Sequence, residues 1–299
     1  MNRLTTVVTV AVLLLVSTAA FGQYTTAVIA DNGLAPGLTT ARYMGMGSVG
    51  VAVADDAGAI NYNPANLASL NIAPPAGEHS DLDMPWNWQA TGTYELAGEL
   101  DYWALHFAGS NPSAEWGFGA SFHSTSSPAW IVADWWLVGI GARMGSSDWQ
   151  WGVSMMDSGE DLYGDETIFN AGLLYNGQVR LDQPIRIGLT VEDITDEFQE
   201  GPFFSLGIGL PFFCGWGDGV FGADLLDATD QYDSMFNVGL EFNPRACENW
   251  TLGGGLVDTD WLTAGAGYNN GPWNLDLSWQ ESAESGVDDE IATTFSFLF

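Results

Sequence analysis

The sequence WNLDLSWQ at residues 273–280 places large apolar side chains at every second position and polar side chains between them. A period of two is typical of a β-strand whose two faces meet different surroundings. The segments 184–194 and 234–243 repeat the pattern. Soluble β-sandwiches and outer-membrane β-barrels both alternate in this way, because each strand has one apolar face and one polar face. The stretch therefore predicts an all-β chain and leaves these two classes open.

The number of strands and the lengths of the turns separate the two classes. Tight turns such as 145–147, 214–217 and 269–271 alternate with longer acidic loops. An even number of antiparallel strands, with tight turns at one end and longer loops at the other, is typical of bacterial outer-membrane barrels. We therefore predict a fourteen-stranded antiparallel outer-membrane β-barrel over residues 86–299. The candidate strands are 86–97, 101–109, 115–124, 133–144, 148–156, 167–177, 184–194, 203–213, 218–225, 234–243, 249–257, 261–268, 272–280 and 291–299. The longer acidic loops are 157–166, 195–202, 226–233 and 281–290.

Aromatic residues gather near the ends of these strands, where amphipathic rings favour the membrane interfaces. A general preference of aromatic residues for strands is the alternative explanation. The chain also ends on an alternating strand with Phe295, Phe297 and Phe299, which resembles the insertion signal at the C-terminus of outer-membrane barrels. We expect outer-membrane lipid and the barrel assembly machinery as partners. The interfacial tryptophans are Trp86, Trp88, Trp116, Trp135, Trp149, Trp250, Trp261 and Trp279.

Residues 1–22 have the pattern of a secretory signal peptide. Arg3 is the positive charge, residues 7–16 form the apolar core, and Ala20-Phe21-Gly22 is a small-x-small cleavage site. No later segment approaches the roughly 18 uninterrupted apolar residues of a transmembrane helix. The expected location is therefore the cell outer membrane, and residues 23–85 form an N-terminal hatch or plug segment before the barrel.

The composition limits the partners and suggests a habitat. The 299 residues carry 38 acidic side chains against 6 basic ones, a formal charge of −32. Such a charge repels phosphate backbones, so we exclude nucleic acid as a partner. With 46% hydrophobic residues the chain is also too apolar to be disordered. Lysine is absent from the sequence, and we take this as the mark of a high-salt environment that screens dense carboxylates.

Cys214 and Cys247 are the two cysteines of the chain. An exported protein meets an oxidising compartment, and the predicted turns place both residues at the same end of the barrel. We expect a disulfide between them, with two free thiols as the alternative.

Residues 40–68 break the alternating pattern. A glycine-rich segment comes first, and we expect it to be a strand. Asp55 and Asp56 follow where carboxylates favour the exposed N–H groups of a helix start. Pro64 then removes a backbone donor and forces Asn63 out of helical geometry. The sequence predicts a small hatch made of a strand and a short kinked helix.

The stretch 40–68 resembles the R-x-x-G-M-G, A-V-A-D-D-A and N-P-A-x-L-A signature of the FadL-like outer-membrane protein superfamily, and in particular its PorV/PorQ-type branch. This resemblance implies a fourteen-stranded barrel with an N-terminal hatch folded inward on the periplasmic side. In FadL-type members the hatch belongs to a path for hydrophobic molecules, and in PorV-type members the barrel serves the type IX secretion system. The residues that match the signature and would shape the hatch or path are Arg42, Gly45, Met46, Gly47, Asp55, Asp56, Asn63, Pro64 and Ala65.

No catalytic motif is present, so the sequence predicts neither an enzyme nor a cofactor. His106 and His123 fall on the polar faces of neighbouring strands, where lumen hydrogen bonding is favoured over a metal or proton site. The acidic loop 157–166 is interpreted as solvated, with calcium binding as the alternative. A lumen charge network is also expected, and it either biases a pore toward cations or braces the wall. Its members are Glu95, His106, His123, Arg186, Glu192, Asp224, Glu241 and Asp276.

Three functions remain open from the sequence. The leading hypothesis is a FadL-like transport protein that passes or holds a hydrophobic small molecule. The second is a PorV-like component of the type IX secretion system that binds secreted cargo proteins. The third is a structural barrel whose lumen is plugged.

Overall fold

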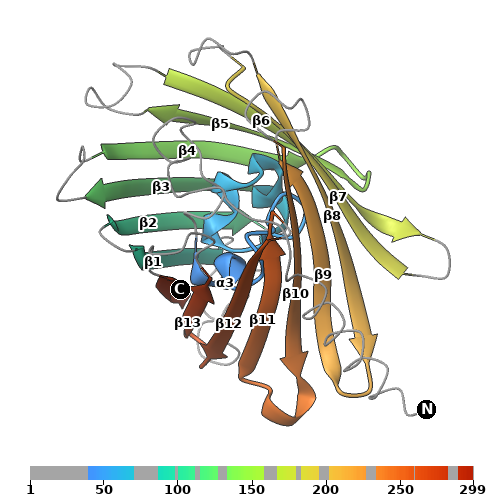
Figure 1. Cartoon of the computed structure of the whole chain (residues 1–299). Helices are drawn as coiled ribbons and strands as arrows, with labels where there is room; N and C mark the ends of the chain where they lie inside the picture. Colours follow the sequence, from blue (N-terminus) through green and yellow to red (C-terminus); the bar gives the residue numbers. More distant parts are fainter. Residues whose placement is uncertain are drawn as a thin grey trace.

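A computed structural model of the chain describes residues 40–70, 87–97, 100–111, 115–126, 133–157, 167–179, 183–194, 202–226, 234–258, 260–281 and 289–298. These residues form a closed antiparallel barrel of fourteen strands, in which each strand pairs with its neighbours in the chain. Figure 1 shows the strands surrounding residues 40–70, drawn in blue. The predicted signal peptide, residues 1–22, lies outside the described residues.

The strands follow the predicted order along the chain. They are β1 (Asn87–Ala97), β2 (Leu100–Asn111), β3 (Trp116–Ser126), β4 (Ala133–Arg143), β5 (Trp149–Asp157), β6 (Thr167–Val179), β7 (Gln183–Glu192), β8 (Phe203–Cys214), β9 (Gly217–Leu226), β10 (Met235–Pro244), β11 (Trp250–Val257), β12 (Trp261–Asn269), β13 (Trp273–Gln280) and β14 (Glu290–Leu298). β1 closes the barrel against β14, with Gln89 opposite Leu298 and Ala97 opposite Glu290. The fourteen-stranded fold predicted from the sequence is confirmed.

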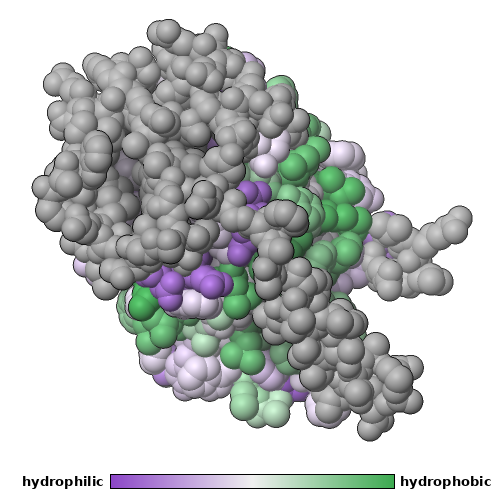
Figure 2. Space-filling model, viewed as in Figure 1, coloured by the Kyte–Doolittle hydropathy of each residue, from purple (hydrophilic) through white to green (hydrophobic). Residues whose placement is uncertain are grey.

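The two faces of each strand meet different surroundings. On β2, Leu105 points outward and is 56% exposed, whereas its neighbours Ala104 and His106 are buried inside the barrel. On β14, Phe295 and Phe297 likewise point outward, and Thr294 and Ser296 point inward. In Figure 2, green apolar residues form patches among paler ones on the coloured part of the surface. An apolar exterior around a polar interior is the arrangement that a barrel needs in lipid.

Three of the predicted interfacial tryptophans lie as expected, and Trp135 does not. Trp116, Trp149 and Trp250 each begin a strand and are exposed on the outer face. Trp135 instead lies inside the barrel, where its ring stacks on His123 with a centroid distance of 4.9 Å. The alternation of β4 explains the correction, because Trp136 occupies the outward position beside it. Trp86 and Phe299 lie outside the described residues.

Residues 40–70 lie inside the barrel, and we call them the hatch. They contain the helix α3 (Ala41–Met44) and the 3-10 helices η1 (Ala57–Asn61) and η2 (Pro64–Ser69). The strand predicted for the glycine-rich segment is wrong: α3 is followed by turns, and Gly47 and Ser48 have φ angles of 73° and 55°. Such angles belong to the left-handed region and end any extended run. No helix in the described part of the chain is long and apolar enough to cross a membrane.

The cysteines lie at the same end of the barrel, as expected, but the predicted disulfide is absent and both are free thiols. Cys214 ends β8 and pairs with Gly217 of β9, which in turn pairs with Pro244 of β10. Cys247 ends the turn η3 (Arg245–Cys247) beyond β10. Cys214 therefore lies at the turn between β8 and β9, and Cys247 at the next turn of the same rim, after β10.

Candidate functional site

A belt of glycines lines the barrel wall where it meets the hatch. Many of these glycines face one another across strand pairs, as Gly152 faces Gly141 on one side and Gly172 on the other. A Cβ at Gly239 would overlap the carbonyl oxygen of Met46, and one at Gly172 would overlap the side chain of Asn63. Interiors are packed too densely to absorb such a methyl group without a shift. We call this set the glycine belt: Gly117, Gly141, Gly152, Gly172, Gly188, Gly207, Gly222, Gly239, Gly253, Gly255 and Gly265.

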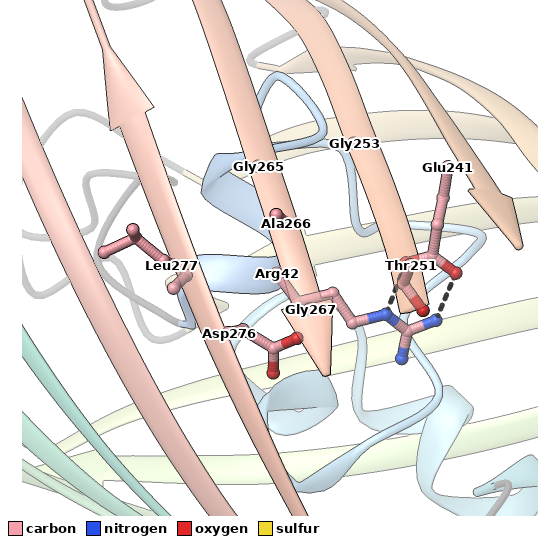
Figure 3. Close-up of a pocket in the computed structure, with 10 residues that line it drawn as sticks. Arg42, Glu241, Thr251, Gly253, Gly265, Ala266, Gly267, Asp276 and Leu277 are labelled. Atoms are coloured by element: carbon pink, nitrogen blue, oxygen red, sulfur yellow. Dashed lines mark hydrogen bonds and ion pairs between the residues drawn. The ribbon is translucent and has the colours of Figure 1, made fainter. Parts of the chain in front are cut away.

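The first half of the hatch, residues 40–56, is held by charged groups, and we call it the latch half. The guanidinium of Arg42 donates Nε to Oε2 of Glu241 on β10 at 2.6 Å and Nη2 to Oε1 at 3.0 Å. Its Nη1 donates to Asp55 within the hatch at 2.7 Å and lies 3.7 Å from Asp56. Figure 3 shows the side chain of Arg42 extending over β11 and β12 to the carboxylate of Glu241. A bidentate pair of this kind fixes geometry as well as charge.

The charges around Arg42 set the pKa values of the hatch carboxyls. Burial acts to lower the pKa of Arg42, but Asp55 and Glu241 outweigh it and hold the pKa well above its usual value. Burial would raise the pKa of Asp55, yet Arg42 and Arg186 lower it. Asp56 lies farther from the guanidinium, and burial raises its pKa to about 6. The latch half therefore contains one carboxyl that is firmly ionised and one that titrates close to neutral pH.

Two further wall residues anchor the latch half through its backbone. Oδ2 of Asp224 on β9 accepts hydrogen bonds from the N–H groups of Gly50 at 2.7 Å and Val51 at 2.9 Å. Oγ1 of Thr294 on β14 accepts from the N–H of Ala41 at 2.7 Å. The carboxylate of Asp224 is fully buried. It therefore accepts hydrogen bonds from two backbone N–H groups that would otherwise be buried without an acceptor.

The second half of the hatch, residues 57–70, is held by uncharged groups, and we call it the wedge half. Asn63 caps η2 by accepting from the N–H of Ala65 at 3.0 Å. Its amide donates to the carbonyls of Val51 at 2.9 Å and of Leu173 on β6 at 3.2 Å. Pro64 occupies the first position of η2, where its missing N–H costs nothing. The kink predicted at Asn63 and Pro64 is thus a boundary between two 3-10 helices, fixed by one asparagine.

A polar cluster joins the wedge half to β2 and β3. His123 lies between the hydroxyl of Tyr102, 2.5 Å from Nδ1, and Oδ1 of Asn61, 3.1 Å from Nε2. The amide of Asn61 also lies 3.4 Å from Nδ1 of His106. The two imidazole rings face the lumen together, 5.3 Å apart, as the sequence predicted. No group of three metal-ligating side chains occurs among the described residues, so this geometry favours the hydrogen-bonding interpretation.

The structure only partly assembles the predicted lumen network. Glu241 and Asp224 contact the hatch, whereas Glu95 is buried against β14 and Glu192 accepts a bond from Thr190. Arg186, expected to face the carboxylates, contacts the carbonyl of Val53 at 3.5 Å. The cation that pairs with Glu241 is Arg42 of the hatch. The sequence interpretation missed Asn61, Asn66, Tyr102 and Thr294.

The lumen wall facing the wedge half carries an apolar patch within the polar interior usual for such barrels. Leu137 of β4, Met156 of β5 and Ile168 of β6 are at most 2% exposed and point inward. They form one hydrophobic cluster with Ile60 and Leu67 of the hatch. Polar side chains such as Gln150 and Ser154 share this wall, and the buried carboxylates Asp224 and Glu241 lie on the other side of the lumen.

Comparisons with known proteins bear on the fold. No protein-family model and no curated protein sequence matches the chain. Among solved structures, the CymD monoaromatic hydrocarbon channel matches with a TM-score of 0.52 and 12% identity over 88% of this chain and 97% of that one. A TodX deltaS2S3 mutant, also described as a monoaromatic hydrocarbon channel, matches with a TM-score of 0.52 and 10% identity over 87% and 97%. The chain has the fold of these channels.

A Pseudomonas aeruginosa FadL homologue matches with a TM-score of 0.49 and 10% identity over 87% of this chain and 97% of that one. Identities near one tenth relate folds and leave family branches open, so membership of the PorV/PorQ-type branch stays a prediction. The outer-membrane barrel fold supports the predicted location.

Proposed function

We propose that this protein is an outer-membrane transport protein that passes a hydrophobic small molecule, with the hatch as its movable part. The observation that carries the proposal is the apolar patch of the lumen wall formed by Leu137, Met156 and Ile168. A porin for polar solutes gains nothing from aliphatic side chains facing its lumen. A hydrophobic molecule, in contrast, would gain from leaving water for this surface.

The hatch supports the proposal in a second way. It is joined to the wall by side-chain contacts, by the close fit to the glycine belt and by the ion pair of Arg42 with Glu241. Such contacts break without breaking the barrel ladder, because the strands pair with one another all the way round. The two channels with the same fold are described as monoaromatic hydrocarbon channels, which agrees with a hydrophobic cargo.

The experiment is uptake of the fluorescent hydrocarbon amine 1-N-phenylnaphthylamine into proteoliposomes with a trapped quencher. The wild type should accelerate entry above protein-free vesicles, and Ile168→Asn should abolish the gain by adding a polar group to the apolar patch. Val153→Ala on the lipid face of β5 is the matched control, because Val153 is 42% exposed. Equal entry for wild type and Ile168→Asn would overturn the proposal.

A plugged structural barrel is the second candidate, and the close fit between hatch and glycine belt favours it. The same assay decides, because a permanent plug predicts no entry above that of empty vesicles. The predicted secretion role depends on a cargo protein and on external loops outside the described residues, and it stays a prediction. Co-purification of a secreted protein would support it.

A further inference from the structure

A trough lined largely by glycines runs along the wall beside Arg42, and the side chain of Thr251 on β11 also lines it. It is formed by Gly253 of β11 and by Gly265 and Gly267 of β12, which face the lumen. Glu241 stands on one bank of this trough and Asp276 of β13 on the other. A cavity of about 10 Å³ lies between them, which is the space of about one water molecule. We call this feature the glycine trough.

The carboxylates of Glu241 and Asp276 differ in their hydrogen-bond partners. Glu241 is paired with Arg42 through two hydrogen bonds. Asp276 lies at the same cavity, and within the described part of the chain it makes neither a hydrogen bond nor an ion pair. In Figure 3 its carboxylate points toward the trough, whereas Leu277 points away from it. The wall thus offers Arg42 a second acceptor that is free.

The helix that carries Arg42 sits on the side of the free acceptor. α3 packs against β12, β13 and β14, and β13 is the strand of Asp276. The side chain must therefore extend over β11 and β12 to reach Glu241 on β10. The hatch backbone at Gly45 covers Gly253 and Gly265, whereas the nearest groups over Gly267 are the carboxylate of Asp276 and the Cβ of Thr251. At Gly267, therefore, no side chain of β12 stands between the guanidinium and Asp276.

We propose that Arg42 has two docking positions on the barrel wall, Glu241 in the closed state and Asp276 in a second state, and that exchange between them releases the latch half of the hatch. The inference rests on the proposed function, since it describes how the same hatch moves. Its physical basis is the high cost of leaving a buried charge without a partner. A second carboxylate removes this cost during movement, because Arg42 is paired at both ends of its path.

The test measures exposure of the hatch directly. A single cysteine replaces Val49, which is fully buried in the latch half, in a background of Cys214→Ser and Cys247→Ser. The labelling rate by a small water-soluble methanethiosulfonate reports how often the latch half is released. Asp276→Asn should slow labelling roughly tenfold, since the second position loses its charge. Glu241→Gln should accelerate it by a similar factor, and Asp276→Glu should restore the wild-type rate.

Unchanged or faster labelling in Asp276→Asn would overturn the inference, because Asp276 would then be neutral or would help to keep the hatch closed. Gly267→Ala provides a second variant that leaves all charges in place: its methyl would overlap the Asp276 carboxylate and narrow the trough, so labelling should slow. Gly254→Ala is its control, with the nearest atom 3.8 Å away. The assay contains no cargo. Slowed labelling in a barrel that admits no hydrocarbon would leave this inference standing and reject the proposed transport function.

Discussion

The wedge half of the hatch rests on β1 to β6 through η1 and η2, and its polar contacts join uncharged groups such as Asn63 and Leu173. The latch half rests on β7 to β14, where Arg42 and carboxylates of the wall supply its polar contacts. Apolar burial and neutral hydrogen bonds hardly respond to salt, whereas a bond to one cation depends on the charges around it. The same barrel therefore holds one half of its hatch firmly and the other half conditionally.

The two halves of the hatch are also expected to contribute differently to transport. The strands that carry Leu137, Met156 and Ile168 contact η2 of the wedge half, so a cargo surface there keeps its shape, although their apolar cluster also includes Met46 and Val49 of the latch half. Ion pairs taken out of water contribute little net stability, because desolvation offsets their attraction. Motion is therefore expected to begin at the latch half, with the wedge half as the hinge.

The largest effect on the docking of the hatch should come from disrupting its packing against the glycine belt, which both halves share. Gly239→Val would drive a side chain into the backbone of Met46 and displace the latch half altogether. Limited trypsin digestion measures this, because Arg42 is the one cleavage site among residues 40–70. Cleavage after Arg42 should appear in Gly239→Val and be absent in Gly254→Ala. Protection of Arg42 in both variants would show that the belt is not needed to seat the hatch.

Loss of the cation comes next. Arg42→Met leaves Glu241 buried without its partner and should destabilise the docked hatch by about 3–5 kcal/mol. A double-mutant cycle with Glu241→Gln measures the coupling in urea unfolding of the micellar protein. The double variant should cost less than the sum of the two single variants, since Glu241 is then no longer left as an unpaired buried charge. Additive costs would mean that the bidentate contact contributes nothing as a pair.

Asn63→Ala should cost about 2–3 kcal/mol, because it removes the cap of η2 and leaves two carbonyls without donors. Asn63→Asp keeps the capping oxygen and loses the amide donors, so it should fall between alanine and wild type. Both effects should be the same at low and high salt, in contrast to Arg42→Met. A strong salt dependence of Asn63→Ala would remove the distinction between the halves.

The smallest effect concerns the pH response of the latch half. Burial raises the pKa of Asp56 to about 6, above the roughly 3.9 of an unfolded chain. A raised carboxyl pKa gives stability that is complete below about pH 4 and is lost as pH rises through about 6. Asp56→Asn should therefore stabilise the protein by about 1–3 kcal/mol at pH 7.5 and change little at pH 4. Urea midpoints at both values measure it, and equal gains at both would contradict the assignment.

The barrel was predictable because its strands alternate apolar and polar residues in the sequence. The stretch 273–280 indicates which side chains face lipid, and the tight and long turns indicate the two ends. The hatch was less predictable. Its glycine-rich segment fits a strand by composition alone, and only the wall glycines opposite it explain why Gly45 and Gly47 are needed. Local sequence carries no information on such a distant contact.

The candidate site shows the same limit. Arg42, Asn63 and Glu241 were found from motif and alternation, but their partners were not. Arg186 was the expected counter-ion because it lies on a strand, whereas the actual cation comes from the hatch, about two hundred residues before Glu241 in the chain. The disulfide was not predicted correctly either, since two cysteines at the same rim, in neighbouring turns, are both free. These pairings depend on barrel register.

Hydrogen–deuterium exchange of the micellar protein tests the central claim most directly, by comparing peptides from residues 40–56 and residues 57–70. The N–H groups of Gly50 and Val51 depend on Asp224, whereas those of Asn63 and Asn66 are bonded within the wedge half. Exchange should be faster in residues 40–56 and should accelerate in Glu241→Gln, with residues 57–70 unchanged. Equal rates in the two halves, or faster exchange in residues 57–70, would contradict the division of the hatch into a conditional latch and a firm wedge.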